Sequence, residues 1–245
     1  MKSGLIWSFA EACGAARSAE EVHALFFREV ASLGFAYVAC ASHVDPLHPP
    51  RGAVVLINYP DAWLEHFSAS GYAGRDPVFE AAREQVLPFQ WTDAAFLSRL
   101  RPDQRKILQE AAEYGLEEGF TIPLHVHGAL PASCSLIAGP DGVDPLSLRA
   151  AHWLAVYAHE AARRVSAPAD APREKVKLGK RERECLELVG RGKDDFAIGV
   201  ILGIKQSTAH NTVQRSMKKY GVATRIQAVM RALCDGEIRI DDVAD

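Results

Sequence analysis

A polar, proline-containing segment at residues 166–175 divides this chain of 245 residues into two parts that must fold around separate cores. The segment has two prolines among small and charged residues, so it offers no apolar face to bury. Residues 1–165 carry 13 Lys and Arg against 19 Asp and Glu, whereas residues 178–233 carry 11 against 5. We therefore predict an acidic domain at 1–165, a linker at 166–177 and a basic domain at 178–245 whose charge suits a polyanionic partner.

Composition and cysteine spacing exclude several classes of protein. With 48% apolar and 24% charged residues, the chain is typical of globular domains, and no apolar run approaches the ~20 residues of a membrane helix. Glu11 interrupts the apolar N-terminal stretch, which predicts an amphipathic helix up to Ala16 rather than an export signal. The five cysteines stand singly, which favours reduced thiols over a disulfide framework. We expect a cytoplasmic protein without membrane contact.

Motifs of metal, nucleotide and serine-hydrolase chemistry are missing from the sequence. His125 and His127 share one face of a predicted strand, but no third ligand is evident nearby, so we predict no metal site. The chain has no Walker A motif, no G-x-G-x-x-G fingerprint and no G-x-S-x-G elbow. We therefore expect neither a cofactor nor enzymatic activity.

The first domain mixes the periods of helices and strands. Ser18 is expected to cap a helix whose capping box Glu21 completes and whose apolar stripe runs from Val22 to Leu33. The other predicted elements are strands at 35–41, 54–59, 121–126 and 132–138, and helices from residue 60, at 101–115 and at 146–164. Helices at both ends of a run of strands predict an α-β-α sandwich with an antiparallel sheet, so the whole chain is assigned to the α+β class.

The second domain is predicted to be all-α, in the arrangement of a helix-turn-helix domain. Glycine-containing turns separate four short helices, at 180–190, 194–201, 206–220 and 224–234, and a solvated acidic tail follows at 235–245. In a helix-turn-helix unit the second helix lies in the major groove of DNA, which here is the helix at 206–220. Its residues Ala209, Val213 and Met217 form an apolar stripe opposite a face of hydrogen-bonding side chains.

Hydrogen-bonding and basic residues on and around this helix are the candidate DNA contacts. Asn and Gln can form two hydrogen bonds with adenine, His can donate to guanine, and Lys and Arg suit phosphates. The candidates are Lys193, Lys205, Gln206, Ser207, His210, Asn211, Gln214, Lys218, Lys219 and Arg225. The alternative is a helical interaction module with a basic, solvated face; the helix lengths, the turns and the sign of the charge favour DNA.

The second domain also resembles the DNA-binding domain of LuxR-type regulators. Glu182, Leu186 and Gly192 occur at the spacing of that family. The resemblance implies that Glu182 ties the first helix to the rest of the domain, that Leu186 lies in the core and that Gly192 permits a turn. Two departures are Gly179 in place of a Thr or Ser cap and Gly199 in place of a common alanine; we expect Gly199 to weaken its helix by ~1 kcal/mol.

The first domain resembles the acyl-homoserine-lactone sensor of quorum-sensing LuxR regulators. The positions that carry this resemblance are Asn58, Tyr59, Pro60, Trp63, Asp76, Pro77, Val78, Trp91, Tyr114, Gly115, Leu116, Gly119, Phe120, Pro123 and Ser135. It implies that Trp63 donates to the lactone carbonyl and that Asp76 accepts from the amide N–H of such a ligand. It also implies that the hydroxyls of Tyr59 and Ser135 serve the amide carbonyl and that Trp91 stacks near the lactone.

One departure in the first domain concerns the acyl group of the ligand. Phe67 stands where the family usually has tyrosine, so a hydroxyl near the acyl part of the pocket is missing. We therefore predict a ligand without a 3-oxo group, with a short branched or an aromatic acyl group. The candidate wall residues are Ile57, Val78, Phe79 and Leu108, while Pro77 and Gly119 are implied to shape the backbone.

Together the two resemblances cover nearly the whole chain and imply a ligand-responsive transcription regulator. Its expected partners are a homoserine lactone, double-stranded DNA and a second copy of the chain, because in the family the last helix, here 224–234, forms part of the homodimer contact. Two recognition helices would then meet a two-fold related DNA site. The alternatives are a regulator that acts without ligand or is released from DNA by it, and a lactone-processing enzyme on a similar scaffold.

Overall fold

The computed structural model describes residues 2–126, 129–166 and 176–243. These residues form two units, Met1–Ala169 and Asp170–Asp245, each with its own hydrophobic core. Most of the predicted linker at 166–177 lies outside the described residues, so its extent stays a prediction.

The first unit is built on a five-stranded antiparallel sheet. Its strands are β1 (Phe35–Ser42), β2 (Val55–Ile57), β3 (Phe89–Gln90), β4 (Gly119–Leu124) and β5 (Ala132–Ala138), in the spatial order β2-β1-β5-β4-β3. Between β1 and β5, Cys40 pairs with Cys134 and Ala39 pairs with Ser135. Because side chains alternate along a strand, the two cysteines point to one face of the sheet, and Ala39 and Ser135 point to the other.

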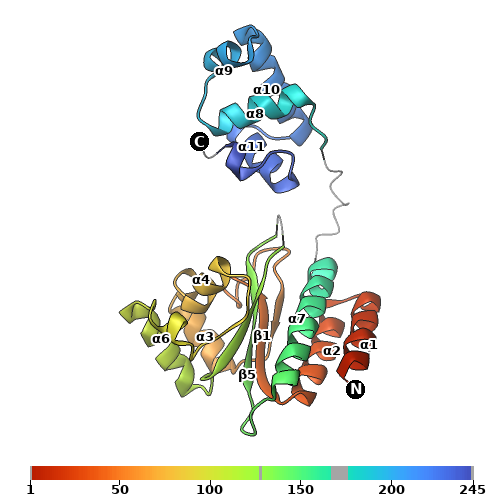
Figure 1. Cartoon of the computed structure of the whole chain (residues 1–245), viewed down its shortest axis with the longest axis vertical. Helices are drawn as coiled ribbons and strands as arrows, with labels where there is room; N and C mark the ends of the chain where they lie inside the picture. Colours follow the sequence, from red (N-terminus) through yellow and green to blue (C-terminus); the bar gives the residue numbers. More distant parts are fainter. Residues whose placement is uncertain (1, 127–128, 167–175, 244–245) are drawn as a thin grey trace. The chain divides into compact units, whose positions relative to one another are not determined.

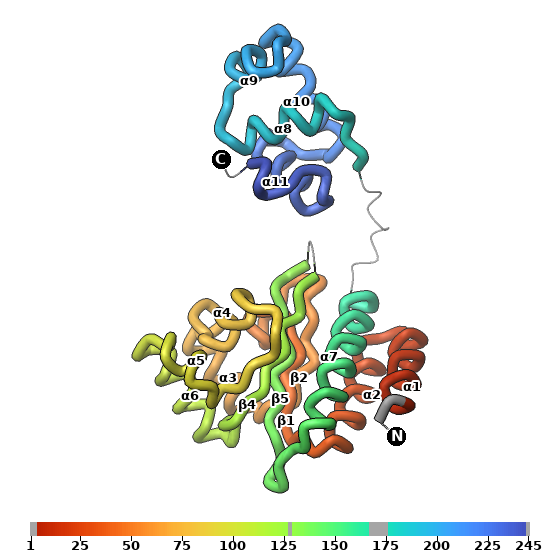
Figure 2. The backbone as a smooth tube through the Cα atoms, in the orientation of Figure 1, coloured from red at the N-terminus to blue at the C-terminus, as the bar shows by residue number. Residues whose placement is uncertain are grey.

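Helices cover both faces of this sheet. They are α1 (Lys2–Ala15), α2 (Ala19–Ser32), α3 (Asp61–Ala69), α4 (Pro77–Glu84), α5 (Ala94–Leu97), α6 (Pro102–Glu113) and α7 (Pro145–Ser166), with the 3-10 helix η1 (Tyr72–Gly74). Helices α1, α2 and α7 lie on one side of the sheet, and α3 to α6 lie on the other (Figures 1 and 2). This layering confirms the predicted α-β-α sandwich and the α+β class.

Local sequence explains where two of these helices begin. Ser18 Oγ accepts a hydrogen bond from the N–H of Glu21 at 3.2 Å, as predicted, but the Glu21 carboxylate caps the N–H of Arg17 rather than that of Ser18. Asp76 caps α4 and Pro77 occupies its first turn, where a missing N–H costs no helical hydrogen bond. The sequence pattern did not indicate α4, α5, η1 or β3; of these, α5, η1 and β3 have at most four residues, which is too short to show a period.

The second unit contains the four predicted helices. They are α8 (Lys180–Gly190), α9 (Asp195–Leu202), α10 (Gln206–Tyr220) and α11 (Arg225–Asp235), followed by the 3-10 helix η2 (Ile240–Asp242). Leu186, Ile198 and Val213 are fully buried between them. Gly192 has φ +75°, a left-handed conformation that glycine adopts without strain, so its implied role in a turn holds.

Two expectations about the second unit were wrong. A Cβ on Gly199 would lie 2.9 Å from the carbonyl oxygen of Ile204, so glycine here permits close packing of α9 against the turn and is not simply a weak point of the helix. The acidic tail is not merely a solvated end. Val243 packs against Gly190, and Arg191 Nε donates to the carbonyl oxygen of Asp242 at 2.9 Å.

Candidate functional site

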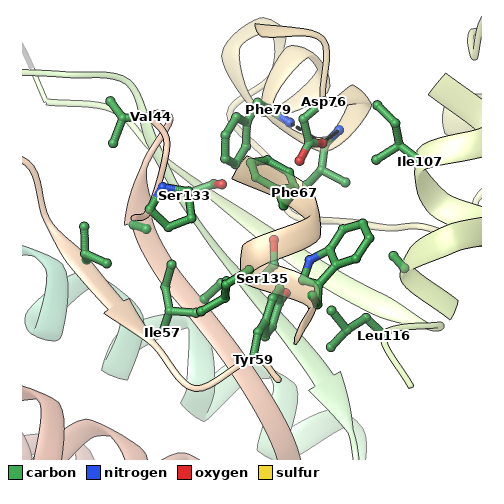
Figure 3. A pocket seen from close by; sticks show the side chains of 18 of the residues that line it. Val44, Ile57, Tyr59, Phe67, Asp76, Phe79, Ile107, Leu116, Ser133 and Ser135 are labelled. Atoms are coloured by element: carbon green, nitrogen blue, oxygen red, sulfur yellow. Dashed lines mark hydrogen bonds between the residues drawn. The ribbon is translucent and has the colours of Figure 1, made fainter. Parts of the chain in front are cut away.

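A pocket lies in the first unit, between the sheet and helices α3, α4 and α6 (Figure 3). Its empty space, with its opening included, is about 720 Å³. The pocket lining includes all ten residues predicted to contact a ligand, namely Ile57, Tyr59, Trp63, Phe67, Asp76, Val78, Phe79, Trp91, Leu108 and Ser135. The fold therefore gathers at one cavity a set of residues that spans positions 57 to 135 of the chain.

One face of the sheet forms the floor of the pocket. Ser135 pairs with Ala39 on β1 and with Thr121 on β4, and two residues earlier on β5, Ser133 pairs with Ala41. Residues two apart on a strand share a face, so Ser133 and Ser135 both face the pocket. The small side chains of Ala39 and Ala41 leave room above the sheet that larger residues would fill.

Asp76 provides a carboxylate on the wall of the pocket. Its Oδ1 accepts hydrogen bonds from the N–H groups of Val78 at 2.7 Å and Phe79 at 3.4 Å, as the cap of α4. Both bonds use Oδ1, so Oδ2 keeps its lone pairs for a donor in the pocket. Burial raises the pKa of Asp76 to about 6, although the two N–H groups and Arg83 act in the opposite direction.

Tyr59 brings a buried hydroxyl that has no hydrogen-bond partner among the described residues. The Ser135 hydroxyl lies close enough to lower the pKa of Tyr59 slightly. Its hydrogen bond, however, is with Thr121 Oγ1, 2.9 Å away. Burial, together with Cys134 and Asp76, raises the pKa of Tyr59 well above its usual range, so the group stays a neutral donor. A buried polar group without a partner costs roughly 1–3 kcal/mol, a cost that a ligand oxygen here would remove.

Trp91 is fixed between the pocket and β4. Its indole Nε1 donates to Thr121 Oγ1 at 2.8 Å, so Trp91, Thr121 and Ser135 form a short chain of hydrogen bonds. A Cβ on Gly119 would lie only 2.3 Å from the Trp91 ring, which explains why this position of β4 is glycine. The indole N–H of Trp91 is therefore used within the protein, and its predicted stacking on a ligand stays a prediction.

The side chains of Trp63 and Phe67, on α3, belong to a cluster of aromatic rings. Their ring centroids are 5.9 Å apart, and Tyr72 lies 6.3 Å from Trp63 and 5.9 Å from Phe67. Between them along the helix, His66 Nε2 bonds to Glu110 of α6 at 2.8 Å, and the Tyr72 hydroxyl donates to the same carboxylate. These two partners lower the pKa of Glu110 to about 2, so a carboxylate anchors α3 over the pocket.

Sequence analysis missed several residues of the lining. They are Ala39, Ala41, Ser42, Val44, Pro46, Val55, Leu64, Ile107, Ala111, Leu116 and Ser133. Strand alternation could have indicated Val55 from Ile57 and Ser133 from Ser135, because each pair is two residues apart. To place Ala39 and Ala41 in the lining, one must know the register of β1 against β5, which the sequence does not reveal.

The candidate DNA contacts lie on and around α10. Its buried side consists of Ala209, Thr212, Val213 and Ser216, so the predicted apolar stripe is partly polar; Thr212 and Ser216 donate to the carbonyls one turn earlier. Seven candidates are exposed and form no ion pair with a described residue of the unit: Lys193, Lys205, Gln206, Ser207, Asn211, Gln214 and Lys218. Arg215 and Thr208 are also exposed on α10, and sequence analysis did not select them.

Three other candidates are bound within the unit. Asp195 of α9 bonds to His210 Nδ1 at 2.8 Å and to an Arg225 guanidinium nitrogen at 3.0 Å. Lys219 Nζ lies 2.6 Å from Glu182 Oε2, and the same oxygen accepts from the N–H of Gly179. Glu182 therefore ties α8 to α10, as the resemblance implied, and three of the ten side chains are less free to meet DNA.

Within the described ranges, no group of three or more His, Cys, Asp and Glu side chains could hold a metal ion. His127 lies outside those ranges, so the pair that it forms with His125 in the sequence is not described. No helix among the residues that the structure covers is long and apolar enough to span a membrane.

Both units match known families. Residues 18–162 match the model of the autoinducer binding domain, and residues 176–232 match that of bacterial regulatory proteins of the luxR family. The transcriptional activator SolR of Ralstonia solanacearum is 32% identical over 243 residues, which cover 94% of this chain and 98% of SolR. The HTH-type quorum sensing-dependent transcriptional regulator RpaR of Rhodopseudomonas palustris is 32% identical over 217 residues, 86% of either chain. Escherichia coli SdiA shares the fold, with a TM-score of 0.66 at 21% identity over 96% of this chain and 98% of the SdiA chain.

Proposed function

This chain belongs to the LuxR family of bacterial regulatory proteins, and we propose that the pocket of its first unit binds an N-acyl- or N-aroyl-homoserine lactone. Its autoinducer-binding and DNA-binding domains make it a quorum-sensing transcriptional activator rather than an enzyme, in agreement with the names of its relatives. We also propose which lactone the pocket binds and how the second unit meets DNA.

The buried Tyr59 hydroxyl, without a partner beside the Asp76 carboxylate, is the observation that carries the ligand class. The amide of an acyl-homoserine lactone offers a carbonyl acceptor and an N–H donor next to each other. Tyr59 would donate to the carbonyl, while Asp76 Oδ2 would accept from the N–H in a charge-assisted bond. The indole N–H of Trp63 would donate to the lactone carbonyl, and Trp91 would stack on the lactone ring.

The apolar wall suggests the kind of acyl group. Phe67 and Phe79 lie side by side on the wall, with ring centroids 6.1 Å apart (Figure 3), and Phe67 has no hydroxyl to meet a 3-oxo group. Ile57, Val78 and Leu108 add apolar surface. We therefore propose a short branched or an aromatic acyl group without a 3-oxo substituent.

The second unit would meet a two-fold related DNA site as half of a homodimer. Helix α10 would enter the major groove with Ser207, Asn211 and Gln214 toward the bases. On α11, Ile226 and Met230 are more than half exposed and lie one turn apart, which suits a contact between two copies of this helix. A DNA-binding regulator of this kind would act in the cytoplasm.

The test is the melting temperature of the full chain with a panel of acyl- and aroyl-homoserine lactones. We expect one group of lactones to raise it by several degrees, since a ligand at a hundredfold excess over Kd stabilises by ~2.7 kcal/mol. Asp76→Asn is a suitable comparison, because Asn also caps helices and the variant should fold. The variant should respond at least tenfold more weakly to the same lactone.

Two other results would overturn the proposal. A well-folded protein that binds operator DNA and shows no shift with any lactone would be a regulator that acts without ligand. Hydrolysis of the lactone to its acid by the purified protein, monitored by chromatography, would indicate an enzyme.

A further inference from the structure

A second pair of polar side chains lies toward the opposite end of the pocket floor from Tyr59. Along β1 the face over the pocket carries Ala39 and Ala41, and His43 is the next residue on that face, with its N–H bonded to the carbonyl of Pro131. Ser133 stands on β5 beside Ala41 and lines the pocket. Nothing in the proposed binding of the lactone amide uses His43 or Ser133.

His43 and Ser133 hold each other in a fixed geometry. His43 Nε2 lies 3.0 Å from Ser133 Oγ, and the Ser133 side chain is almost completely buried. The imidazole stacks on the Phe79 ring at 4.3 Å between centroids and 9° between planes. The other ring nitrogen, Nδ1, is buried and has no hydrogen-bond partner among the described residues.

The environment of His43 determines which way the shared hydrogen bond runs. Burial, with Arg83 and His125 nearby, lowers the pKa of His43 to about 3, so the ring is neutral and carries one N–H. An N–H at Nδ1 would be a buried donor without an acceptor, which is rarer in proteins than an unused acceptor. Nε2 therefore carries the hydrogen and donates to Ser133 Oγ.

Because His43 donates to Ser133 Oγ, the hydrogen of the Ser133 hydroxyl is not donated to His43. Within the described residues Ser133 forms no other side-chain hydrogen bond, and its side chain faces the pocket. The lining also contains the apolar residues Val44, Pro46 and Val55, and Ser42, whose Oγ accepts from the N–H of Val54 at 3.0 Å. A donor without an acceptor in a mostly apolar wall favours a ligand atom that can accept and penalises a hydrocarbon in the same place.

We propose that Ser133, positioned by His43, is a specificity-determining donor for an oxygen acceptor in the distal part of the acyl group. The inference rests on the proposed binding of a homoserine lactone and adds its chemical class: an acyl chain or ring with an ether, carbonyl or hydroxyl oxygen. Ser133 lies two residues from Ser135 along β5, a separation of ~7 Å. The oxygen therefore lies several bonds beyond the amide carbonyl, well past the 3-position that Phe67 leaves without a partner.

The test uses lactones that differ only in one acceptor atom. N-octanoyl-homoserine lactone is compared with four analogues in which an ether oxygen replaces the methylene at position 4, 5, 6 or 7 of the chain. Each Kd is measured by calorimetry on the full-length protein and on Ser133→Ala. We expect one position to bind about five- to tenfold better than the other three in the native protein, and this preference to disappear in Ser133→Ala.

The outcomes separate this inference from the function on which it rests. If octanoyl lactone binds and the four analogues show the same pattern in the native protein and in Ser133→Ala, the role of Ser133 is overturned while the lactone pocket stands. If none of the five lactones binds the folded native protein although a branched or aromatic lactone of the melting-temperature panel does, the role of Ser133 is overturned while the lactone pocket stands. If no lactone of that panel binds either, both proposals fall.

A second variant tests the positioning role of His43. His43→Phe keeps a ring that can stack on Phe79 but removes the donor to Ser133. We expect the positional preference among the four analogues to shrink at least threefold while the affinity for octanoyl lactone itself stays within twofold. A preference that persists in His43→Phe and is lost in Ser133→Ala would show that Ser133 acts without His43, and would overturn that part of the inference.

Discussion

The two faces of the sheet support cores of different kinds, although the same strands build both. Toward α1, α2 and α7, Val38, Cys40 and Leu136 pack among aliphatic and aromatic side chains and are almost completely buried. Toward α3 to α6, the same strands present small and hydroxyl residues to a pocket. Because side chains alternate, one strand can serve a filled core and an unfilled pocket at once.

The difference indicates where stability and response to a ligand reside. Within the described part of the first unit, the two buried side-chain atoms without a hydrogen-bond partner, Tyr59 Oη and His43 Nδ1, both belong to residues on or beside the pocket. The carboxylate with a raised pKa, Asp76, also lies there. The filled face therefore sets the stability of the free protein, and the pocket face holds the groups that a ligand would satisfy.

The largest expected effect is a difference in the free energy of unfolding between mutations on the two faces of the sheet. Leu136→Ala leaves a cavity in the filled core and should lower the free energy of unfolding by about 2–5 kcal/mol. Its neighbour Ser135→Ala, on the pocket face, should cost less than about 1.5 kcal/mol and mainly weaken lactone binding. Urea unfolding with and without lactone measures both. Equal losses of stability in the two variants would contradict this division between a filled, stabilising face and a pocket face.

Gly119→Ala tests how tightly the pocket face is built. The added Cβ would meet the Trp91 ring, so the indole must move, at a cost of about 1–3 kcal/mol and with loss of lactone binding. Gly74→Ala is the matched control, since a Cβ there meets no atom within 4 Å. Thermal unfolding and calorimetric titration of both variants provide the comparison; unchanged lactone binding in Gly119→Ala would argue against a fixed Trp91.

Acidification should act on the pocket through Asp76. The pKa of this carboxyl is about 6 in the free protein and about 4 when unfolded, so the native state holds more protons between these values. This group therefore makes the free protein more stable as pH falls from 6 to 4. In the proposed binding mode the lactone amide donates to the carboxylate, so affinity should drop about tenfold between pH 7 and 5. Titrations across that range in Asp76→Asn should be flat by comparison.

The smallest effect has the opposite sign to that of a core mutation. Tyr59→Phe removes a buried hydroxyl that has no partner, and should stabilise the free protein by up to about 1 kcal/mol. The same change should weaken lactone binding severalfold, because a donor to the amide carbonyl is lost. A variant that is less stable without lactone would mean that the hydroxyl already has a partner in the free protein.

Periodicity was sufficient for the long elements and insufficient for the short ones. Helix α10 was predicted over its full length, because its 15 residues repeat an apolar position every three to four residues and end at Gly221. Helix α4 was not predicted, whereas α9, which also has eight residues, was predicted because glycine-containing turns at 192 and 203 bound it. Gly199 was misjudged from helix propensity alone, since its close approach to Ile204 exists only in the folded unit.

Tyr59, Trp63, Asp76, Trp91 and Ser135 were predicted from a family resemblance, and the structure brings them together at one cavity. Physical reasoning from the sequence would not have grouped Tyr59 with Ser135, because their proximity depends on the pairing of β2, β1 and β5. The same dependence on register hid the proximity of His43 to Ser133. Thr121 was also missed; its link to Trp91 depends on β4 lying beside β5.

The ion pair between Glu182 and Lys219 has a consequence for how DNA binding responds to salt. Each phosphate neutralised by a free cationic side chain releases condensed counterions and steepens the fall of log K with log salt by roughly 0.9. Lys219 is already neutralised by Glu182, and Arg225 by Asp195, so neither ammonium nor guanidinium adds fully to that release. The DNA affinity of this protein should therefore weaken with ionic strength less steeply than its number of basic residues suggests. Exposed cations such as Lys193, Lys205, Arg215 and Lys218 would carry the dependence.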